Sequence, residues 1–596
     1  MQNTDAVLDI YRKRGTKSLP LECVYRQLFN PEYYLRAYGK IYRNAGAMTK
    51  GTTEETVDGM DMQRIHNIIG FLKAERYGWT PVRRTEIPKA NGKTRPLGIP
   101  TWSDKLLQEV LRALLEPYYE QRFSPTSHGF RPKRSCHSAL RQVQKRWKGT
   151  VWFIEGDIKG CFDNIDHAVL LAIIKRDIHD DQLVKLLAGL LKAGYMENWR
   201  YFDSLSGTPQ GGILSPLLAN VYLNELDKFV EDTLIPTYTN GEKRRKNPEH
   251  DRLKGQILTA RNNSNHRQVK LLRQYRRTLP SKAVSDPDYR RLRYVRYADD
   301  FLLGFVGPKT EAEAIREDIG EFLERIKLTL SLEKTLITHA LDGSAKFLGY
   351  EVTTVRDGNL IAKDGRRASN GRIVLLMPTK VMGKYRSLYS KGEKIIHRAE
   401  LLADTDYTIL QRYQAVLAGV YNFYCMATNV SKRMQPVKWI LETSLLKTLS
   451  SKYRVSVTKI RSRYKVANAE PVTYRVVIDR PDKEPLIATF GGIRFERKPE
   501  GLGTTDFLYE QAWFGPGGNR SEIVQRLLAG KCELCDTMDG PFQVHHIRKL
   551  ANLSQPGRRP KAPWEQIMSA RKRKTLVVCT ACHYKIHAGQ YDGPKL

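Results

Sequence analysis

The chain has 596 residues, with 99 Lys and Arg against 64 Asp and Glu, so its formal net charge is +35. That length indicates several domains, and 41% hydrophobic residues can form real cores, which excludes a wholly disordered basic protein. A charge of this size favours a polyanionic partner, because Lys and Arg that neutralise phosphates release counterions.

The sequence offers no membrane segment and no secretory signal. No apolar run approaches the roughly 18–20 residues that span a bilayer, and residues 1–15 contain acids and lack an apolar centre. We therefore expect an intracellular protein with no membrane partner and no secretion. Its place would be the bacterial cytoplasm, in association with the nucleoid, or an organelle.

Helical periodicity dominates the first part of the chain. Residues 1–85 alternate apolar and basic positions at helical spacing, as in the run from Met62 to Leu72. The stretch 87–100 (IPKANGKTRPLGIP) predicts a loop, because Asn-Gly and Pro break regular structure. An amphipathic helix is predicted directly after it, over residues 103–122.

Two β elements are predicted around acidic residues. Residues 151–157 (VWFIEGD) form a short apolar run that ends on Asp157, which predicts a buried strand. Residues 293–305 predict a β-hairpin with Asp299 and Asp300 at its turn, because apolar residues flank the two acids.

A basic insertion lies between these elements, at about 234–292. Residues 241–296 carry 17 Lys and Arg against five Asp and Glu, and their density of Asn, Pro and other polar residues predicts a loop-rich segment. Helical patterning returns over 375–465, and residues 475–495 have a strand-like pattern. The Gly/Pro-rich segment 514–520 is the best linker candidate before the last module.

The three acids suit phosphoryl transfer. Template-directed polymerisation uses two Mg²⁺ ions, one to activate the 3′-hydroxyl and one to stabilise the departing pyrophosphate. Hard cations prefer oxygen ligands, so carboxylates from separate strands must converge on one point. Asp157 at a strand end and Asp299-Asp300 at a turn meet that need. Taken alone, the Asp-Asp pair equally fits a simple turn former.

The surroundings of these acids resemble the motifs of reverse transcriptases. Tyr297-Ala298-Asp299-Asp300 matches their YxDD box, and residues 157–162 (DIKGCF) resemble their first catalytic motif, with an aromatic five positions after the acid. Residues 209–216 (PQGGILSP) resemble the following motif, and residues 347–350 (FLGY) the primer grip. In this order, the motifs make the chain similar to group II intron-encoded reverse transcriptases (maturases) over essentially its whole length.

The resemblance implies roles for individual residues at the polymerase site. Asp157 and Asp299 are the implied main Mg²⁺ ligands, with Asp300 assisting. Phe162 is the implied steric gate, because a bulky ring there leaves no room for a ribonucleotide 2′-hydroxyl. Its substrates are therefore expected to be dNTPs.

Further dNTP contacts follow from the same resemblance. Lys89 and Arg95 would clamp the triphosphate, since Arg offers bidentate donors and Lys a point charge. Gln210 and Gly211 would lie against the nascent base pair, where only a small residue lets the backbone approach. Lys334 would donate to the departing pyrophosphate, or it is a solvated surface lysine.

The helical region 375–465 resembles the thumb followed by the maturase domain X, with residues 417–424 (LAGVYNFY) and 444–449 (SLLKTL) matching characteristic stretches. Helices with basic faces and many Tyr can hold phosphates while they stack bases, which agrees with intron RNA as the partner. The basic insertion is expected to contact RNA, with a merely solvated loop as the alternative.

Four cysteines close to the C-terminus predict a metal site. Cys532 and Cys535 form one C-x-x-C pair, and Cys579 and Cys582 form another. Four thiolates suit a closed tetrahedral Zn²⁺ site of structural type. A disulfide framework is not expected in a chain without an export signal.

Four histidines lie in the same module. His583 and His587 share one face of a helix and can hold one cation, whereas the adjacent His545 and His546 point to opposite sides of a strand. This pattern resembles the HNH (ββα-metal) endonucleases. The resemblance implies His546 as general base, with His545, His583 and His587 around one divalent ion. The family's middle Asn has no counterpart near Lys574, so a zinc ribbon that merely holds DNA is the alternative.

The implied fold is multidomain, α/β plus all-α. It has a right-hand polymerase with palm, fingers and thumb, a helical domain X and a small zinc-bearing HNH module. The implied domains are an N-terminal extension or fingers (1–85), fingers and palm (86–365), thumb and domain X (366–474), a DNA-binding region and linker (475–525) and the HNH endonuclease (526–596).

The implied function is that of a multifunctional intron-encoded protein. It would be an RNA-directed DNA polymerase and a maturase bound to its intron RNA as a ribonucleoprotein. Its nuclease would nick target double-stranded DNA for target-primed reverse transcription. Three alternatives stay open: a retron-type or defence-associated reverse transcriptase, which would lack domain X and HNH, a splicing-only maturase, and a nuclease on an inert polymerase scaffold.

Overall fold

The computed structural model describes most of the chain. The described residues are 3–44, 46–88, 92, 94–197, 200–204, 206–207, 211–279, 282–283, 286–331, 333–355, 371–480, 483–503, 521–553 and 561–590. Lys89, Gln210 and the predicted linker 514–520 lie outside them. Within the described ranges, no helix combines the length and the apolar character needed to cross a membrane.

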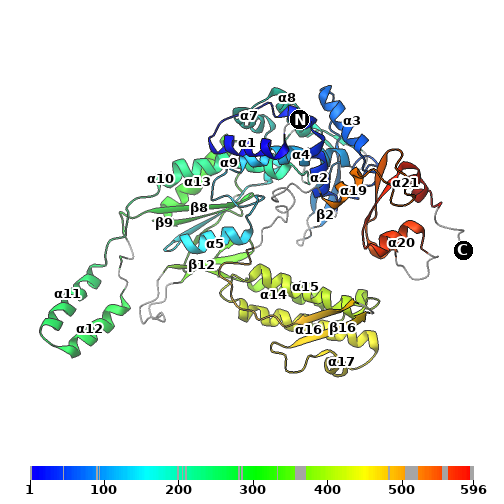
Figure 1. The fold of residues 1–596 in the computed structure, drawn as a ribbon. Coiled ribbons are helices and arrows are strands. Elements are labelled where there is room, and N and C mark those ends of the chain that lie inside the picture. The colour runs from blue at the N-terminus through cyan, green and yellow to red at the C-terminus, as the bar shows by residue number, and fades with distance from the viewer. Residues whose placement is uncertain are drawn as a thin grey trace.

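A layer of helices forms the N-terminal part, as the periodicity predicts. The helices α1 (Thr4–Thr16), α2 (Pro31–Ile41) and α3 (Met62–Lys73) each begin at a residue whose side chain accepts a backbone N–H, which satisfies an otherwise free donor. They pack around α4 (Trp102–Tyr119), which is buried along most of its length (Figure 1). The helix predicted over 103–122 is therefore confirmed.

The stretch predicted as a loop is a β-hairpin. Strand β2 (Val82–Pro88) pairs antiparallel with β3 (Thr94–Ile99), from Arg83 opposite Ile99 to Pro88 opposite Thr94. The loop prediction was wrong because it weighted Asn-Gly and Pro over the pairing capacity of the flanking residues. A four-stranded sheet results, in the order β3-β2-β6-β7, where β6 is Tyr195–Glu197 and β7 is Arg200–Phe202.

The central sheet has the order β10-β4-β9-β8 and contains both predicted β elements. Strand β4 (Trp152–Asp157) lies between β10 (Ile337–His339) and β9 (Asp300–Val306), and β8 (Arg291–Tyr297) forms an edge. Side chains alternate between its two faces, so each face has its own core. One face packs on α9 (Ser215–Phe229) and α13 (Lys309–Arg325), and the other on α5 (Cys136–Arg146).

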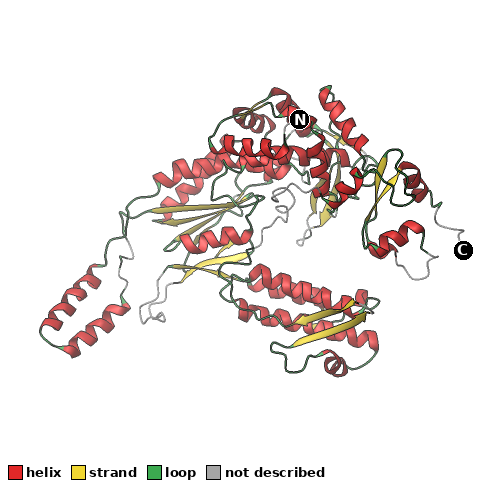
Figure 2. Ribbon diagram, in the orientation of Figure 1, coloured by secondary structure: helices red, strands yellow, loops and turns green. Residues whose placement is uncertain are grey.

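The following lobe is helical with a β-ribbon, which confirms both predictions for this part of the chain. The small sheet β11-β12-β13 (Ala345–Phe347, Tyr350–Val355 and Arg372–Leu376) leads into it. Its helices are α14 (Thr379–Tyr389), α15 (Asp406–Tyr424), α16 (Val430–Tyr453) and α17 (Val457–Tyr464). The ribbon consists of β16 (Thr473–Arg480) and β17 (Lys483–Gly491), and it packs mainly on α15 (Figure 2).

The basic insertion is a helical hairpin, so the prediction of a loop-rich segment was wrong. Helices α11 (Pro248–Asn262) and α12 (His266–Thr278) project away from the rest of the molecule (Figure 1). Asn247 and Asn265 cap their N-termini, and Leu253, Ile257 and Val269 are buried. A narrow apolar seam is enough to pair two helices, although the overall composition is polar.

The C-terminal module docks on the N-terminal helices. It contains α19 (Glu522–Leu528), β18 (Phe542–His546), α20 (Pro563–Ala570), β19 (Thr575–Cys579) and α21 (Thr580–His587). Ile523, Val524 and Leu527 of α19 join the same apolar core as the N-terminal helices, and α19 contacts α2. The two ends of the chain therefore share one core.

Candidate active sites

Three carboxylates meet at one end of the central sheet. Asp157 is the last residue of β4 and stands directly opposite Asp300, the first residue of β9. Asp299 occupies the turn between β8 and β9, next to Ala298, which has a positive φ of 56°. The buried strand and the hairpin were both predicted, and their pairing brings the three acids together.

Burial and mutual repulsion disfavour three full negative charges in this cluster. Burial, together with the charges of Asp299 and Asp157, raises the pKa of Asp300 to about 7. The pKa of Asp299 is also raised, first by burial and then by Asp157. A bound divalent cation would relieve this repulsion, and oxygen ligands from separate strands are what a hard cation prefers. The residues present fit Mg²⁺.

Two predicted phosphate-binding cations lie at this cluster. The Nζ atom of Lys334 is 2.7 Å from Oδ2 of Asp157, although 67% of the lysine side chain is exposed. Arg95 lies exposed on β3, and its charge acts to lower the pKa of Asp299. Both residues therefore face the carboxylates, whereas Lys89 lies outside the described residues.

Phe162 and Gly211 are held by close packing. Phe162 lies in the short helix α6 (Cys161–Asn164), and its ring contacts Phe130 edge to face at 6.0 Å between centroids. Gly211 has a φ of +109°, and a Cβ atom there would lie 2.5 Å from the carbonyl oxygen of Gly98. Strand β3 thus requires glycine at this position, whatever else approaches it.

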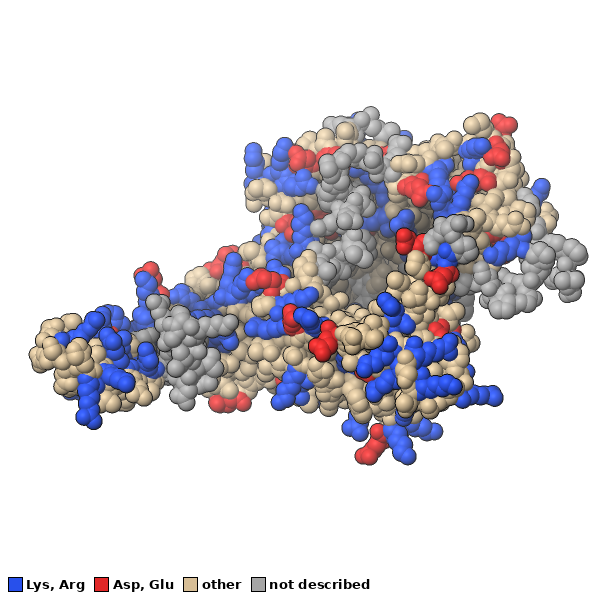
Figure 3. Space-filling model, turned by 60° about the horizontal axis from the view of Figure 1, so that its bottom comes forward, with Lys and Arg blue, Asp and Glu red and all other residues tan. Residues whose placement is uncertain are grey.

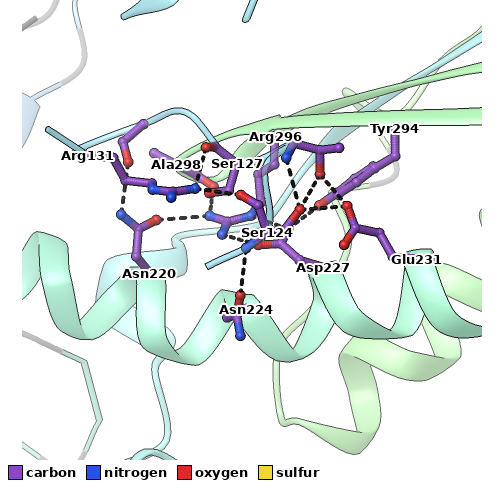
Figure 4. Close-up of polar contacts among 12 residues, drawn as sticks. Ser124, Ser127, Arg131, Asn220, Asn224, Asp227, Glu231, Tyr294, Arg296 and Ala298 are labelled. Atoms are coloured by element: carbon purple, nitrogen blue, oxygen red, sulfur yellow. Dashed lines mark hydrogen bonds and ion pairs between the residues drawn. The ribbon is translucent and has the colours of Figure 1, made fainter. Parts of the chain in front are cut away.

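A buried ion pair supports the hairpin turn, and sequence reasoning missed it. Arg296 and Asp227 are completely buried, with Nη2 2.6 Å from Oδ2 and Nε 2.7 Å from Oδ1. Nη1 of Arg296 also donates to the carbonyl oxygen of Ala298 at 2.9 Å and to Oδ1 of Asn220 at 3.1 Å. Tyr294 donates its hydroxyl to Asp227 at 2.9 Å (Figure 4).

This bidentate pair fixes the backbone immediately before the two turn aspartates, because the Ala298 carbonyl has a charged donor. One signal in the sequence could have found it. Arg296 shares a strand face with the apolar-facing Tyr294, which is an unexpected position for a charge without a buried partner.

The four cysteines form a compact cluster, as their spacing predicts. The Sγ atoms of Cys532, Cys535, Cys579 and Cys582 all lie within 4.8 Å of one another. Cys535 and Cys579 are 3.8 Å apart, which is about the edge of a tetrahedron with Zn–S bonds of about 2.3 Å. Although burial opposes it, backbone N–H donors lower the pKa of Cys532 to about 7 and favour the thiolate. The cluster fits Zn²⁺.

Three of the four histidines gather around a carboxylate that was not predicted, that of Asp58. Nε2 of His587 lies 2.7 Å from Asp58 Oδ2 and 3.2 Å from Nε2 of His583. Nε2 of His583 and Nδ1 of His545 are each 3.4 Å from Asp58 Oδ1. His545 is 4% exposed, and among the described residues neither of its ring nitrogens has a hydrogen-bond partner. Buried imidazole nitrogens that make no hydrogen bond and lie beside a carboxylate fit a divalent ion.

His546 faces the other side of β18, as strand alternation predicts. Its side chain is buried, and its Nε2 lies 3.0 Å from the hydroxyl of Tyr38 on α2. Burial lowers the pKa of His546 to about 3, so the ring is neutral at ordinary pH. Its role as general base stays a prediction.

Asp58 carries no motif and comes from the loop before α3, so sequence reasoning had no signal for it. It lies 487 positions before His545 in the chain. Only the docking of the C-terminal module on the N-terminal part brings it to the histidines.

Comparisons with known proteins match three segments of the chain to family models and nearly its whole length to a relative. Family models match for a reverse transcriptase (RNA-dependent DNA polymerase) over residues 87–251, a type II intron maturase over 379–480 and an AI2M/AI1M-like HNH endonuclease over 532–583. The chain is 38% identical to the group II intron-encoded protein LtrA of Lactococcus lactis, over 98% of this chain and 99% of that protein. It is 31% identical to the putative COX1/OXI3 intron 1 protein of Saccharomyces cerevisiae, over 94% of this chain and 68% of that protein.

The family models match in the order in which the geometry places a carboxylate centre, a basic helical lobe and a metal-binding module. The LtrA match leaves almost no part of either chain uncovered. The chain therefore belongs to the group II intron-encoded proteins and is an RNA-directed DNA polymerase with maturase and HNH endonuclease domains.

Proposed function

We propose that DNA synthesis takes place at the carboxylate cluster of Asp157, Asp299 and Asp300. The observation that carries this proposal is their convergence from β4 and the β8–β9 turn, with the pKa of Asp300 raised to about 7. Two Mg²⁺ ions bound there would activate the primer 3′-hydroxyl and stabilise the pyrophosphate. Asp157 and Asp299 would be the main ligands, and Asp300 would assist.

The residues around the cluster would orient the dNTP. Lys334, 2.7 Å from Asp157, is placed to donate to the departing pyrophosphate, and Arg95 to bind the triphosphate together with Lys89. The packed ring of Phe162 would exclude a 2′-hydroxyl. Gln210 and Gly211 would lie against the nascent base pair.

The lobes would then correspond to a right hand. The central sheet would be the palm, and the β3-β2-β6-β7 sheet with the N-terminal helices would be the fingers. Residues 366–474 would be the thumb and domain X, and residues 475–525 the DNA-binding region and linker. In support, α5 and the β11-β12-β13 sheet link the palm core to the lobe of α14–α17.

The basic surface supports intron RNA as the bound partner. Lys and Arg gather on the projecting α11–α12 hairpin and over the lobe of α14–α17 and the β16–β17 ribbon (Figure 3). Cations on two separated surfaces can contact phosphates of one large folded RNA. The ribonucleoprotein would promote splicing and then act at target DNA.

The C-terminal module would nick the second strand of that DNA. His545, His583 and His587 would hold the nuclease ion, and His546 would take a proton from the attacking water. The four-cysteine cluster would hold a structural Zn²⁺, which stabilises the module. The polymerase would then extend the 3′ end that the nick creates, copying the intron into DNA.

Asp299→Asn tests the polymerase centre. Primer extension should fall at least about a hundredfold, because a lost direct ligand should cost more than the roughly 10–100-fold typical of outer partners. Intron RNA affinity should not fall, since a carboxylate repels phosphate. The matched control is Asp342→Asn, whose side chain is 83% exposed. Normal extension by Asp299→Asn would refute the proposal.

The raised pKa of Asp300 makes cation binding depend on pH. Below pH 7 Asp300 retains a proton that the cation must displace, so affinity should rise with pH up to about 7 and level off above it. One displaced proton corresponds to up to about tenfold per pH unit. Direct titration with Mn²⁺ from pH 6 to 8 of the full chain carrying His583→Ala, which disables the histidine cluster, measures this slope, and Asp300→Asn should flatten it. A wild-type slope that is already flat would contradict the prediction.

The effect of the buried Arg296–Asp227 pair on stability can be measured separately from its effect on the position of the turn. Arg296→Met should cost roughly 3–5 kcal/mol, because it leaves Asp227 buried without its partner, and primer extension should fall as well. In the double variant Arg296→Met/Asp227→Met most of the stability should return, because no charge stays buried.

Extension by the double variant should stay low, because the Ala298 carbonyl still lacks its charged donor. Hydrogen exchange of β8 reports the stability and primer extension reports the positioning. Full recovery of extension in the double variant would show that the contact with Ala298 does not matter.

Cys532→Ser tests the structural metal. The variant should lose about one Zn²⁺ per chain, because three thiolates no longer close a tetrahedral site, and residues 526–590 should lose hydrogen-exchange protection. Primer extension should be largely preserved. Cys23→Ser, at an exposed cysteine outside the cluster, is the control. Unchanged zinc content in Cys532→Ser would contradict the assignment.

A further inference from the structure

The nuclease site is shared between the two ends of the chain. Asp58, in the loop before α3, places both carboxylate oxygens among the rings of His545, His583 and His587. These four side chains offer three nitrogens and one carboxylate oxygen within 4.8 Å of one another, which suits a transition-metal dication. The N-terminal part therefore supplies a ligand atom to a module that begins more than 450 residues later.

The position of Asp58 is fixed by backbone contacts. Gly59 donates its N–H to the carbonyl of Val544 at 3.0 Å, and Val544 donates back to the carbonyl of Met60 at 3.0 Å. Oδ1 of Asp58 also accepts the backbone N–H of His546 at 2.7 Å. The loop therefore extends β18 by one antiparallel bridge, with its acid directed at the histidines.

A hydrogen bond from outside the cluster orients one of these histidines. Gln543 accepts the Nδ1 proton of His583 at 2.7 Å and donates its own amide to Asp61 at 3.0 Å. This arrangement leaves the lone pair of His583 Nε2 directed at the cluster, as in metal-binding histidines with an outer partner. Asp61 comes from the same N-terminal loop as Asp58, so the loop supports the cluster twice.

Residues of the N-terminal part also contact His546 of the C-terminal module. The hydroxyl of Tyr38 lies 3.0 Å from Nε2 of His546, and the rings of Tyr38 and Tyr42 flank it edge to face. A general base needs a free nitrogen for the proton of water. In the docked arrangement Nε2 of His546 is already hydrogen-bonded, and the side chain is buried.

A catalytic metal site keeps one position open for water or substrate, whereas a site with four protein ligands is of the closed, structural type. Three histidines and Asp58 make the closed set. We propose that Asp58 is the fourth ligand of the nuclease ion, and that the docked arrangement is an inactive form of the nuclease in which Asp58 stands where the scissile phosphate must bind. This inference rests on the proposed role of the histidines as the nuclease site.

The charged residues at the boundary between the N-terminal part and the C-terminal module indicate which ligand could separate the two. A cavity of about 370 Å³ lies between the N-terminal part and the module, beside His546. Six cations and one acid, Glu522, line it; the cations are Arg43, Arg526, Arg548, Lys572, Arg573 and Lys574. Arg526 is paired with Glu533 and Arg573 with Glu522, so the lining stays positive overall. A duplex backbone is attracted to such a boundary, and its phosphates can replace both the Asp58 carboxylate at the ion and the Tyr38 hydroxyl at His546.

Asp58→Asn is the central variant. It keeps an oxygen for the backbone N–H of His546 and removes the charge. Measured in an Asp299→Asn background, which disables the polymerase centre, and with the cysteine cluster loaded with zinc, the Mn²⁺ affinity of the full chain should fall at least about tenfold. At saturating Mn²⁺, second-strand nicking of a target duplex by the ribonucleoprotein should rise several-fold, because the position of the phosphate is open.

Two further variants separate the contacts. Tyr38→Phe should raise nicking without changing Mn²⁺ affinity, because only the hydroxyl on His546 is lost. Glu54→Gln is the matched control: it removes a charge from the same loop, but its side chain is 87% exposed and pairs with Lys50. It should change neither measurement.

The other outcomes overturn the inference in distinct ways. Unchanged Mn²⁺ affinity in Asp58→Asn would show that Asp58 is not a ligand. A fall in both affinity and nicking at saturating Mn²⁺ would make Asp58 a ligand needed for cleavage and not an inhibitor. His583→Ala tests the underlying assignment, since normal affinity and nicking in that variant would mean that the histidines do not form the nuclease site at all.

Discussion

Electrostatic repulsion among three neighbouring carboxylates is the constraint around which the centre of this protein is organised. The pairing of β4 with β9 brings Asp157, Asp299 and Asp300 together, and desolvation and the neighbouring charges raise the pKa of Asp300. Like charges on a backbone turn destabilise it unless another group stabilises the turn. Arg296, whose own charge is balanced by Asp227, does so by donating a hydrogen bond to the carbonyl of Ala298. The backbone before the two turn aspartates therefore has a charged donor whether or not a cation is bound.

The nuclease module also brings side chains together in clusters, but these are cysteines and histidines. The four residues of its cysteine cluster all come from the C-terminal module itself. The histidine cluster is different, because its fourth group arrives from the N-terminal part. On the proposals above, the cysteine cluster would stabilise the fold of the module locally, while the histidine cluster would link the state of the module to its position on the rest of the protein. That difference suits an enzyme whose strand cleavage must wait for its target.

Local patterns predicted much of this structure. The buried strand ending on Asp157, the hairpin around Asp299, the helical lobe and both cysteine pairs are periodic or motif-based features, and their elements lie where expected. The β2–β3 hairpin was missed because turn-forming residues hid the pairing of its flanks. The α11–α12 helices were missed because three or four apolar contacts decide them within a polar composition.

The partners in contacts between distant segments had no local signal. The strand pattern marks Arg296 as an unexpected charge, but only the packing of its strand on α9 identifies Asp227 as its partner. Asp58 and Tyr38 reach the histidines only because the C-terminal module shares a core with the N-terminal helices. Residues of this kind are specified by tertiary packing, so a single sequence reveals the chemistry of a site more readily than the partners that regulate it.

The projecting hairpin has a consequence for how the chain tolerates change. Its helices bury apolar residues against each other and form a core of their own, and the chain enters and leaves through paired backbone at Asn240 and Arg290. Because the chain enters and leaves the α11–α12 hairpin at neighbouring points, the hairpin is attached to the β8 edge of the sheet as a separate unit. Its length can vary, or its sequence can be exchanged, without altering the registry of the strands that carry the aspartates.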